Sequence, residues 1–403
     1  MCEPGKAMIL TRRDFWATMG LAAWLVGTLP SHALAQDAKA PFANETSARQ
    51  VFMIDADTGS VLYEKEADAP FLPASLAKLM TMDVVLDALA TGEITPETSY
   101  PVTNHAWRTG GAPSRTSTMF AAVRSSVPVD ALVRGVVIQA ANDGAIVLAE
   151  GLAGSEDAFA ALMNERAKAI GLTNSRFVNP TGLPAEGASV SVRDMATLAR
   201  HISATYPDAY RLYREPQFEW NKILQRNRNP LLGRDIGATG MALGFTEGLG
   251  YSIVGVTERN GRRTILAAAG FETDTARTSE AVRLLAWADT DFERRTLFNA
   301  DTPIATAQVF GGIVSTLPAV LDGDLLATVP VDQSVLGAAL VYDGPLRAPI
   351  AKGDRIGRLD ILVDGKPSIS RPLLAGESVA EGTFSSRAFD AAHELAFGWI
   401  RSL

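Results

Sequence analysis

Apolar residues recur at helical spacing through the first two thirds of the chain. Residues 79–89 form one such run, and Pro73 before it and Gly92 after it are typical of a helix start and a helix end. Gly171 is typical of the end of a later helix. The pattern therefore predicts helices from about Ala74, over 129–152, after Ser155 as N-cap, after Ser191 as N-cap, and over 278–288.

Two β-hairpins are predicted, one at each end of this helical region. The first covers residues 50–63 and turns at Asp57-Thr58-Gly59. The second covers residues 251–269 and turns at Arg259-Asn260-Gly261, where Asn-Gly supplies the positive φ values of a tight turn. Strands at both ends with helices between them predict an α+β fold, in which helices cover a sheet.

A different pattern begins near Thr302. Short apolar runs alternate there with Asp-Gly and Lys-Gly pairs, which predicts a small all-β domain. The predicted organisation is an export signal over 1–35, an α+β domain over 36–300, a β-rich domain over 301–380 and an amphipathic helix over 381–403.

The final predicted helix has two competing placements. Trp399 and Phe397 belong to residue types that favour a membrane interface, which predicts contact with a membrane surface. Only Arg387 and Arg401 are basic, however, so packing of the helix against the β-rich domain is the alternative.

The N-terminus has the pattern of an export signal. Arg12-Arg13 lies in a basic segment, residues 17–29 are mostly apolar, and Ala33-Leu34-Ala35 is typical of a cleavage site. The paired arginines resemble a twin-arginine signal, although general secretory signals also contain them. Cleavage would leave a mature periplasmic chain that starts at Gln36, whereas the alternative is a buried or anchoring helix.

Composition narrows the possible functions. The chain has 403 residues, of which 47% are hydrophobic, and this is enough for more than one domain with a sizeable core. The formal net charge of −8 argues against nucleic acid as a partner. The single cysteine, Cys2, allows no internal disulfide, and the four histidines lie far apart in the sequence, which argues against a zinc site. No cofactor is predicted.

The candidate chemistry lies at the start of the first predicted helix. Ser75 and Lys78 are three residues apart, so they share a helix face and the lysine nitrogen can reach the serine hydroxyl. Serine needs a nearby base to act as a nucleophile, and a lysine can serve where burial lowers its pKa. The free N–H groups of a first helical turn favour developing negative charge. A chance Ser-x-x-Lys in a structural helix is the alternative.

The wider string Pro73-Ala74-Ser75-x-x-Lys78-x-Met80-Thr81 resembles the active-site helix of the low-molecular-weight penicillin-binding proteins, the serine-type D-alanyl-D-alanine carboxypeptidases. The resemblance covers roughly residues 45–295 and, more weakly, the β-rich domain. It implies a β-lactamase/transpeptidase-like domain, in which helices cover an antiparallel sheet. It also implies peptidoglycan peptides as substrates and β-lactams as covalent inhibitors.

Two further motifs of that family are present only in part. Asn142, which by resemblance would orient the substrate amide and Lys78, matches the asparagine of Ser-x-Asn, but Ala140 replaces the serine that relays a proton in the family. In the family's Lys-Thr-Gly motif, Gly244 remains. Ala242 and Leu243 replace the lysine and threonine that help to hold the substrate carboxylate.

The resemblance also assigns roles to the remaining site residues. Lys78 would take the proton of Ser75, and the backbone N–H groups of Ser75 and Phe245 would hold the oxyanion. Thr246 would lie beside them as a further substrate contact. Arg277 aligns with a family arginine and could hold the carboxylate alone, since a guanidinium matches a carboxylate bidentately. The alternative for Arg277 is a surface position on a helix.

We therefore predict a periplasmic serine-type D-alanyl-D-alanine carboxypeptidase. It would trim the terminal D-alanine from peptidoglycan stem peptides through an acyl-enzyme on Ser75. The partial motifs make a catalytically impaired relative, which binds cell-wall peptide or a partner, the first alternative. A β-lactam-reactive serine hydrolase with another substrate is the second, although the chain lacks the Gly-x-Ser-x-Gly signature of simple esterases.

Overall fold

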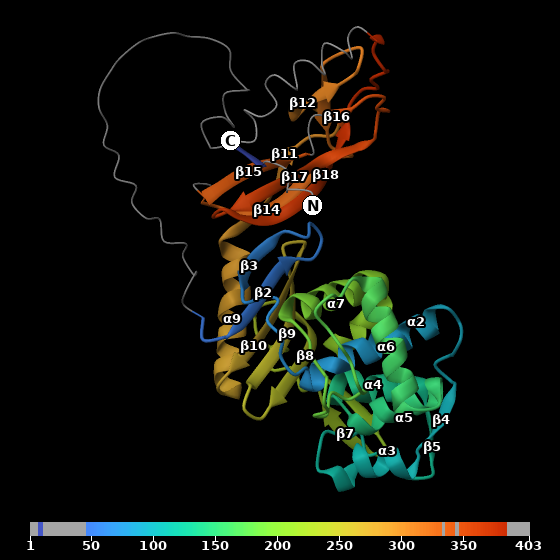
Figure 1. Cartoon of the computed structure of the whole chain (residues 1–403). Coiled ribbons are helices and arrows are strands. Elements are labelled where there is room, and N and C mark those ends of the chain that lie inside the picture. Colours follow the sequence, from blue (N-terminus) through green and yellow to red (C-terminus); the bar gives the residue numbers. More distant parts are fainter. Residues whose placement is uncertain (1–6, 11–45, 333–334, 343–345, 385–403) are drawn as a thin grey trace. The chain divides into compact units, whose positions relative to one another are not determined.

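The structure is a computed structural model that describes residues 7–10, 46–332, 335–342 and 346–384 (Figure 1). Its contacts divide these residues into two compact units. The α+β unit comprises residues 46–57 and 61–290, and the β unit comprises residues 7–10, 58–60 and the described residues from 291 onward.

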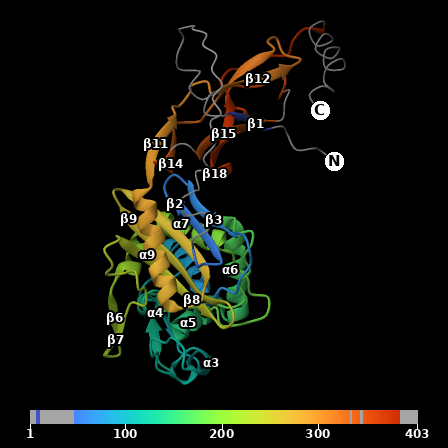
Figure 2. The ribbon, with the colours of Figure 1, turned by 90° about the vertical axis from the view of Figure 1, so that its left-hand side faces the viewer.

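A five-stranded antiparallel sheet forms the centre of the α+β unit. Its strands lie in the order β3 (Val61–Lys65), β2 (Gln50–Asp55), β10 (Arg262–Phe271), β9 (Gly250–Arg259) and β8 (Ala238–Thr246), so β8 is an edge strand. Helix α9 (Asp274–Thr290) packs on β9 and β10, and α7 (Val192–Thr205) packs on β2 and β10. Figures 1 and 2 show these two helices on opposite faces of the sheet. Both predicted hairpins and the α+β architecture are confirmed.

Helix α2 (Ala77–Ala90) lies inside the helical layer. Eleven of its 14 residues are buried, as expected for a helix that is apolar on nearly every side. It packs against α4 (Val129–Gln139), α5 (Asn142–Ala153), α6 (Glu156–Ile170) and α7. Because α2 is enclosed in this way, the residues at its N-terminus are held in fixed places.

The predicted helix ends around α6 and α7 are confirmed. The hydroxyls of Ser155 and Ser191 accept hydrogen bonds from the backbone N–H groups of Ala158 and Asp194, which satisfies donors that the first helical turn leaves free. Gly171 ends α6 with a φ of 87°, a left-handed conformation that glycine adopts without strain.

The prediction of one unbroken helix over 129–152 is wrong. Ala140 has a φ of 55° and interrupts the chain between α4 and α5. The backbone N–H groups of Ala140 and Ala141 both donate to the carbonyl of Gly135, as at an ordinary helix C-terminus. Apolar residues on both sides of the break continue the helical spacing, so the pattern alone hides it.

Shorter elements connect these parts of the α+β unit. They are η1 (Ala74–Leu76), β4 (Ser99–Pro101), α3 (Asn104–Thr109), η2 (Ala112–Ser114), β5 (Ser126–Pro128), α8 (Pro207–Tyr210), η3 (Arg211–Arg214), β6 (Gln217–Trp220) and β7 (Ile223–Arg226). The strands β4 and β5 form one antiparallel pair, and β6 and β7 form another.

The β unit consists of strands, as predicted. One sheet has the order β1 (Ala7–Leu10), β15 (Leu336–Val341), β17 (Arg355–Val363), β18 (Lys366–Ala375), β13 (Thr316–Val320), β12 (Ala305–Phe310) and β16 (Leu346–Arg347). A second pairs β11 (Phe292–Phe298) with β14 (Leu325–Pro330). Because β11 belongs to this unit, the units divide after Thr290, before the boundary at residue 300 that the sequence suggested.

The two terminal segments fall largely outside the description. Of the predicted export signal, the structure describes only Ala7–Leu10, which pairs antiparallel with β15. The rest of the signal and residues 385–403 of the predicted final helix lie outside the described residues. Among the described residues, no helix has the length and apolar character needed to cross a bilayer.

Candidate active site

Ser75 lies in η1, the turn that leads into α2. The preceding Ala74 has a φ of 46°, a left-handed conformation that costs an alanine on the order of 1 kcal/mol. Gly182 packs directly on the Ala74 carbonyl, and a Cβ at residue 182 would overlap that oxygen. The nucleophile turn is thus held by contact with a segment far along the chain.

Lys78 is buried, with 4% of its surface exposed, and its Nζ has two oxygen partners. It lies 3.0 Å from Ser75 Oγ and 2.7 Å from the carbonyl oxygen of Thr181. Burial disfavours the charged amine, and the positive charge of Arg228 nearby adds to this, so that the pKa of Lys78 falls to about 7. A large fraction of Lys78 is therefore neutral near pH 7 and able to accept a proton from Ser75.

The turn at Asn179-Pro180-Thr181-Gly182 holds Lys78 in place. Asn179 Oδ1 accepts hydrogen bonds from the backbone N–H groups of Thr181 (3.1 Å) and Gly182 (2.7 Å). Thr81 Oγ1 donates to the Pro180 carbonyl at 2.6 Å, so Lys78 and Thr81, which share a helix face, are both hydrogen-bonded to this turn. The Asn-Pro pair is typical of a turn, but no local pattern shows that this turn supplies an acceptor to the candidate base.

Strand β8 borders the site with its outer edge. Gly244 allows this edge to approach η1, because a Cβ at residue 244 would lie against Ser252 Oγ, 3.3 Å from the Pro73 carbonyl oxygen and 3.4 Å from Ala74 Cβ. The next residue, Phe245, is 56% exposed and packs against the Tyr251 ring with the centroids 4.6 Å apart. The surviving glycine of the third motif therefore has a steric reason.

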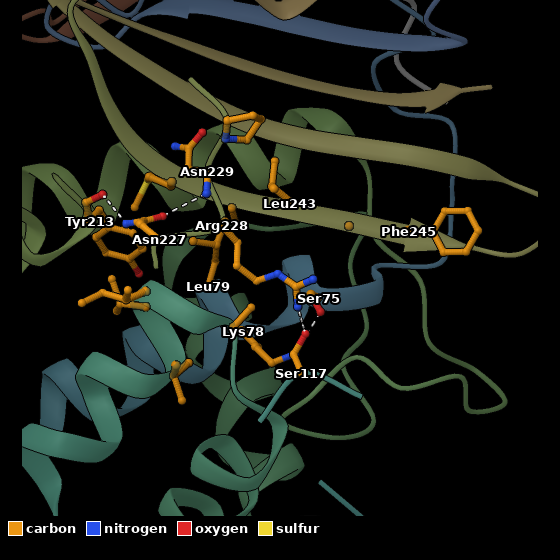
Figure 3. Close-up of a pocket in the computed structure, with 18 of the residues that line it drawn as sticks. Ser75, Lys78, Leu79, Ser117, Tyr213, Asn227, Arg228, Asn229, Leu243 and Phe245 are labelled. Carbon is orange, nitrogen blue, oxygen red and sulfur yellow. Dashed lines mark hydrogen bonds between the residues drawn. The ribbon is translucent and has the colours of Figure 1, made fainter. Parts of the chain in front are cut away.

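A cavity of about 360 Å³ joins most of the predicted site residues. Ser75, Lys78, Gly244, Phe245 and Arg277 all line it, and Figure 3 shows Ser75 and Lys78 beside β8, with Phe245 near the end of that strand. The cavity lining does not include Asn142 or Thr246. The structure thus brings together five of the residues that the sequence singled out.

Asn142 is buried at the start of α5 and is not part of the cavity lining. Its Nδ2 donates to Thr116 Oγ1 at 2.9 Å, and its backbone N–H donates to the Ser117 carbonyl at 2.7 Å. Among the described residues, Asn142 Oδ1 has no hydrogen-bond partner. Asn142 therefore fixes the loop that carries Thr116 and Ser117.

Arg277 is also buried, although it had been equally consistent with a surface position. Only 4% of it is exposed, it forms an ion pair with Asp274, and its guanidinium carbon lies 5.7 Å from the centre of the Tyr251 ring. Its Nε has no hydrogen-bond partner in the described part of the chain. Burial lowers the pKa of Arg277, yet the ion pair with Asp274 opposes this shift. A buried donor of this kind suits an anionic ligand.

Two polar residues that sequence reasoning did not single out, Ser117 and Arg228, also line the cavity. The Arg228 guanidinium donates a hydrogen bond to Ser117 Oγ. Ser117 belongs to none of the motifs that the sequence showed. No spacing links Arg228 to the first motif, because the fold alone brings the two together.

Comparison with known proteins settles the family. The family model described as D-alanyl-D-alanine carboxypeptidase matches residues 35–273. The chain belongs to the D-alanyl-D-alanine carboxypeptidase family. A second family model, described as the penicillin-binding protein 5 C-terminal domain, matches residues 292–381. The predicted family and two-part architecture are therefore confirmed.

Individual members of this carboxypeptidase family resemble most of the chain. The D-alanyl-D-alanine carboxypeptidase DacC of Escherichia coli (strain K12) is 36% identical over 364 residues, which cover 89% of this chain and 91% of that protein. The crystal structure of penicillin binding protein 5 from Haemophilus influenzae has a TM-score of 0.71 at 33% identity and covers 84% of this chain and 98% of that one.

A third similar protein is known with a ligand. Penicillin-binding protein D2 from Listeria monocytogenes, solved in its ampicillin-bound form, has a TM-score of 0.54 at 27% identity. The match covers 60% of this chain and 98% of that one. The family resemblance that the first motif indicated therefore extends to a protein that binds a β-lactam.

Proposed function

We propose that this protein is a serine-type D-alanyl-D-alanine carboxypeptidase that acts on peptidoglycan stem peptides through an acyl-enzyme on Ser75. The Ser75–Lys78 pair carries the proposal. Lys78 Nζ lies 3.0 Å from Ser75 Oγ, and its pKa of about 7 makes it a base at neutral pH. The pair opens into a cavity that also holds the Arg277 guanidinium.

Acylation uses the groups around Ser75. The neutral amine of Lys78 accepts the hydroxyl proton while Ser75 Oγ bonds to the carbonyl carbon of the penultimate D-alanine. Backbone N–H groups of Ser75 and Phe245 stabilise the oxyanion. The proton then reaches the leaving nitrogen, the C–N bond breaks, and D-alanine departs. Lys78 next activates a water molecule, which attacks the ester and releases the shortened peptide and Ser75.

Arg277 is the group that we assign to the terminal carboxylate of the peptide. The Arg277 side chain is buried and lines the cavity, whereas the side chain of its ion-pair partner Asp274 is largely exposed to solvent. A charge-assisted hydrogen bond from this guanidinium to the carboxylate contributes roughly 1.5–3 kcal/mol. The same interaction would hold the carboxylate of a β-lactam, which supports the proposal that β-lactams inhibit the protein.

We assign Asn142 a positioning role through the loop at Thr116 and Ser117, to which it is hydrogen-bonded. Thr246 follows Phe245 at the end of β8, and its contact with substrate remains a prediction. Phe245 presents an exposed aromatic face at the cavity rim, where it can pack against the stem peptide.

Intact-mass spectrometry after incubation with benzylpenicillin tests the acyl-enzyme. The wild-type chain should gain the mass of one penicilloyl group, and Ser75→Ala should gain none. Ser99→Ala serves as the matched control, because Ser99 is exposed on β4 and does not line the cavity. A Ser75-dependent release of D-alanine from a pentapeptide then establishes the substrate.

Failure of these assays would point to the other functions considered above. A chain that forms no adduct at saturating penicillin and releases no D-alanine would support the catalytically impaired binding protein. A penicilloyl adduct without D-alanine release would support a serine hydrolase with another substrate.

We also propose that the mature protein works in the periplasm. Support comes from the Arg12-Arg13 segment, the apolar stretch after it and the Ala33-Leu34-Ala35 sequence. Expression of the full chain in a Gram-negative host and N-terminal sequencing of the product tests this. An N-terminus at Gln36 in the periplasmic fraction is expected, and an uncleaved cytoplasmic product would contradict it.

Contact of residues 381–403 with a membrane surface is the last part of the proposal. Its support is the pair of aromatic residues Phe397 and Trp399 near the end of the chain. The full mature chain should co-sediment with phospholipid vesicles, and a chain that ends at residue 380 should not. Equal sedimentation of both chains would contradict the proposal and favour packing of this segment on the β unit.

A further inference from the structure

The cavity lacks two side chains on which the family's reaction depends, according to the resemblance. Ala140 stands where the family has the serine of its second motif, and Ala242 stands where it has the lysine of its third motif. Both alanines line the cavity. Relative to the family, a hydroxyl and a cation are therefore missing from these two positions of the cavity lining.

Ser117 supplies a hydroxyl to that same cavity from another loop. Its side chain is half-buried and lines the cavity, and its carbonyl accepts the backbone N–H of Asn142 at 2.7 Å. The loop is tied down further, because Asp143 accepts hydrogen bonds from Thr118 Oγ1 (2.6 Å) and from the backbone N–H of Met119 (3.0 Å). Ser117 is thus fixed beside the second motif by that motif's own residues.

Arg228 supplies a cation to the cavity from the segment after β7. Its backbone N–H donates to the Ile138 carbonyl at 3.1 Å, which anchors it at the end of α4. Its neighbours Asn227 and Asn229 are held in a turn, where the Asn229 backbone N–H donates to Asn227 Oδ1 at 2.9 Å. Figure 3 shows the Arg228 side chain reaching from this turn toward Ser75 and Ser117.

The guanidinium of Arg228 is aimed at the reacting groups and is not neutralised. It donates to Ser117 Oγ, and its charge acts on Lys78. In the described part of the chain, no carboxylate lies within ion-pair distance of it, whereas Arg277 has Asp274. The other titratable groups that line the cavity are Tyr213 from η3, Tyr251 from β9, and Asp274 and Arg277 from α9.

We propose that Ser117 takes over the role of the missing serine in this chain, and that Arg228 supports it as a cation in the same cavity. Arg228 disfavours a second positive charge on Lys78 and so keeps it in the basic form. By donating to Ser117 Oγ, Arg228 also turns the Ser117 O–H proton away from itself and toward the substrate. This inference rests on the proposed acyl-enzyme function and deepens it.

Ser117 acts in the step that expels D-alanine. The Lys78 ammonium gives a proton to Ser117 Oγ, while the Ser117 hydroxyl proton moves to the leaving nitrogen and the C–N bond breaks. Lys78 ends neutral, Ser117 regains its hydroxyl, and Arg228 keeps its charge throughout. The number of protons is thus conserved, and no group beyond those in the cavity is needed.

The test measures acylation by a fluorescent penicillin and D-alanine release from a pentapeptide between pH 5.5 and 9. Arg228→Gln should raise the pH midpoint of acylation by about one unit, because removal of a neighbouring cation raises the pKa of Lys78. At pH 7 this shift lowers the acylation rate about fivefold. Ser117→Ala should lower kcat for the peptide by roughly 100-fold and leave KM nearly unchanged, as loss of a proton relay requires.

Conservative variants and a matched control separate these roles from folding defects. Arg228→Lys should restore the wild-type pH midpoint, and Ser117→Thr should restore most of kcat. Arg226→Gln is the control, because Arg226 is exposed on β7 two residues away and does not line the cavity. Because Arg228 acts partly through Ser117, the two losses should not add in the double variant.

The outcomes distinguish this inference from the function on which it rests. A wild type that turns over peptide through Ser75, with Arg228→Gln and Ser117→Ala matching the Arg226→Gln control, overturns the inference and leaves the function intact. Rates lowered equally at every pH, with no rescue by lysine or threonine, also overturn it. A wild type that forms no acyl-enzyme on Ser75 and releases no D-alanine overturns the function and the inference together.

Discussion

Replacement of Lys78 by methionine separates two effects of this lysine, its effect on the free energy of unfolding and its role in acylation. In the folded protein its pKa falls from 10.5 to about 7, so the unfolded chain binds the proton more tightly. Between these two values the unfolded state holds a proton that the folded state lacks, and stability therefore rises with pH. Burial of Lys78 costs the fold about 5 kcal/mol at pH 6 and about 2 kcal/mol at pH 9.

Methionine has nearly the same length as lysine and no charge, so Lys78→Met removes this cost. It also leaves Ser75 Oγ and the Thr181 carbonyl without their hydrogen bonds to Nζ, a loss of about 1–3 kcal/mol that does not depend on pH. The free energy of unfolding of the variant minus that of the wild type should therefore fall by about 3 kcal/mol between pH 6 and pH 9. The variant should also lose acylation at every pH.

Urea unfolding followed by tryptophan fluorescence measures this difference, since Trp107, Trp220 and Trp287 all lie in the α+β unit. Lys168→Met is the matched control, because Lys168 is exposed on α6 and its replacement should change stability by the same small amount at both pH values. A Lys78→Met difference that stays constant from pH 6 to pH 9 would refute the argument that folding forces this lysine toward its neutral form.

Three further predictions concern the residues around the pair. Gly182→Ala should lower the free energy of unfolding by about 1–3 kcal/mol and abolish acylation, because the new Cβ would overlap the Ala74 carbonyl and residue 182 has a φ of 73°. Urea unfolding and the mass of the penicillin adduct measure these two effects, and wild-type values in both would contradict the prediction. Asn179→Ala should slow acylation roughly tenfold, because the turn that presents the Thr181 carbonyl to Lys78 loses the acceptor Asn179 Oδ1. Stopped-flow measurement of the acylation rate tests this, and an unchanged rate would refute it. Arg277→Gln should raise KM for the peptide roughly 10- to 100-fold with a smaller change in kcat; steady-state kinetics measure it, and a change in kcat alone would place the carboxylate elsewhere.

The parts of the site that could be predicted from the sequence are those set by local geometry. Ser75 and Lys78 meet because residues three apart share a helix face, and that spacing is visible in one dimension. The caps Ser155 and Ser191 are local in the same way. The place of Gly244 in the site was implied by resemblance, and its close approach to η1 gives the steric reason for a glycine there.

The parts that could not be predicted depend on contacts between distant segments. The Thr181 carbonyl reaches Lys78 because the turn held by Asn179 packs against α2. The residue types at 179–182 do not show that their turn will contact this lysine. The break at Ala140 is hidden by apolar residues on both sides of it. Arg228 lies in a polar stretch that looks like any surface loop until the fold places it beside Ser117.

The burial of α2 has a consequence for how the protein loses activity. Amide hydrogens in a helix enclosed by four others exchange with solvent through opening of the whole unit rather than by local fraying, so those of α2 should be among the slowest to exchange. Ser75 and Lys78 stand at the start of this helix and share its rigidity. On heating, acylation by penicillin should therefore persist almost to the unfolding midpoint and disappear together with the tertiary structure.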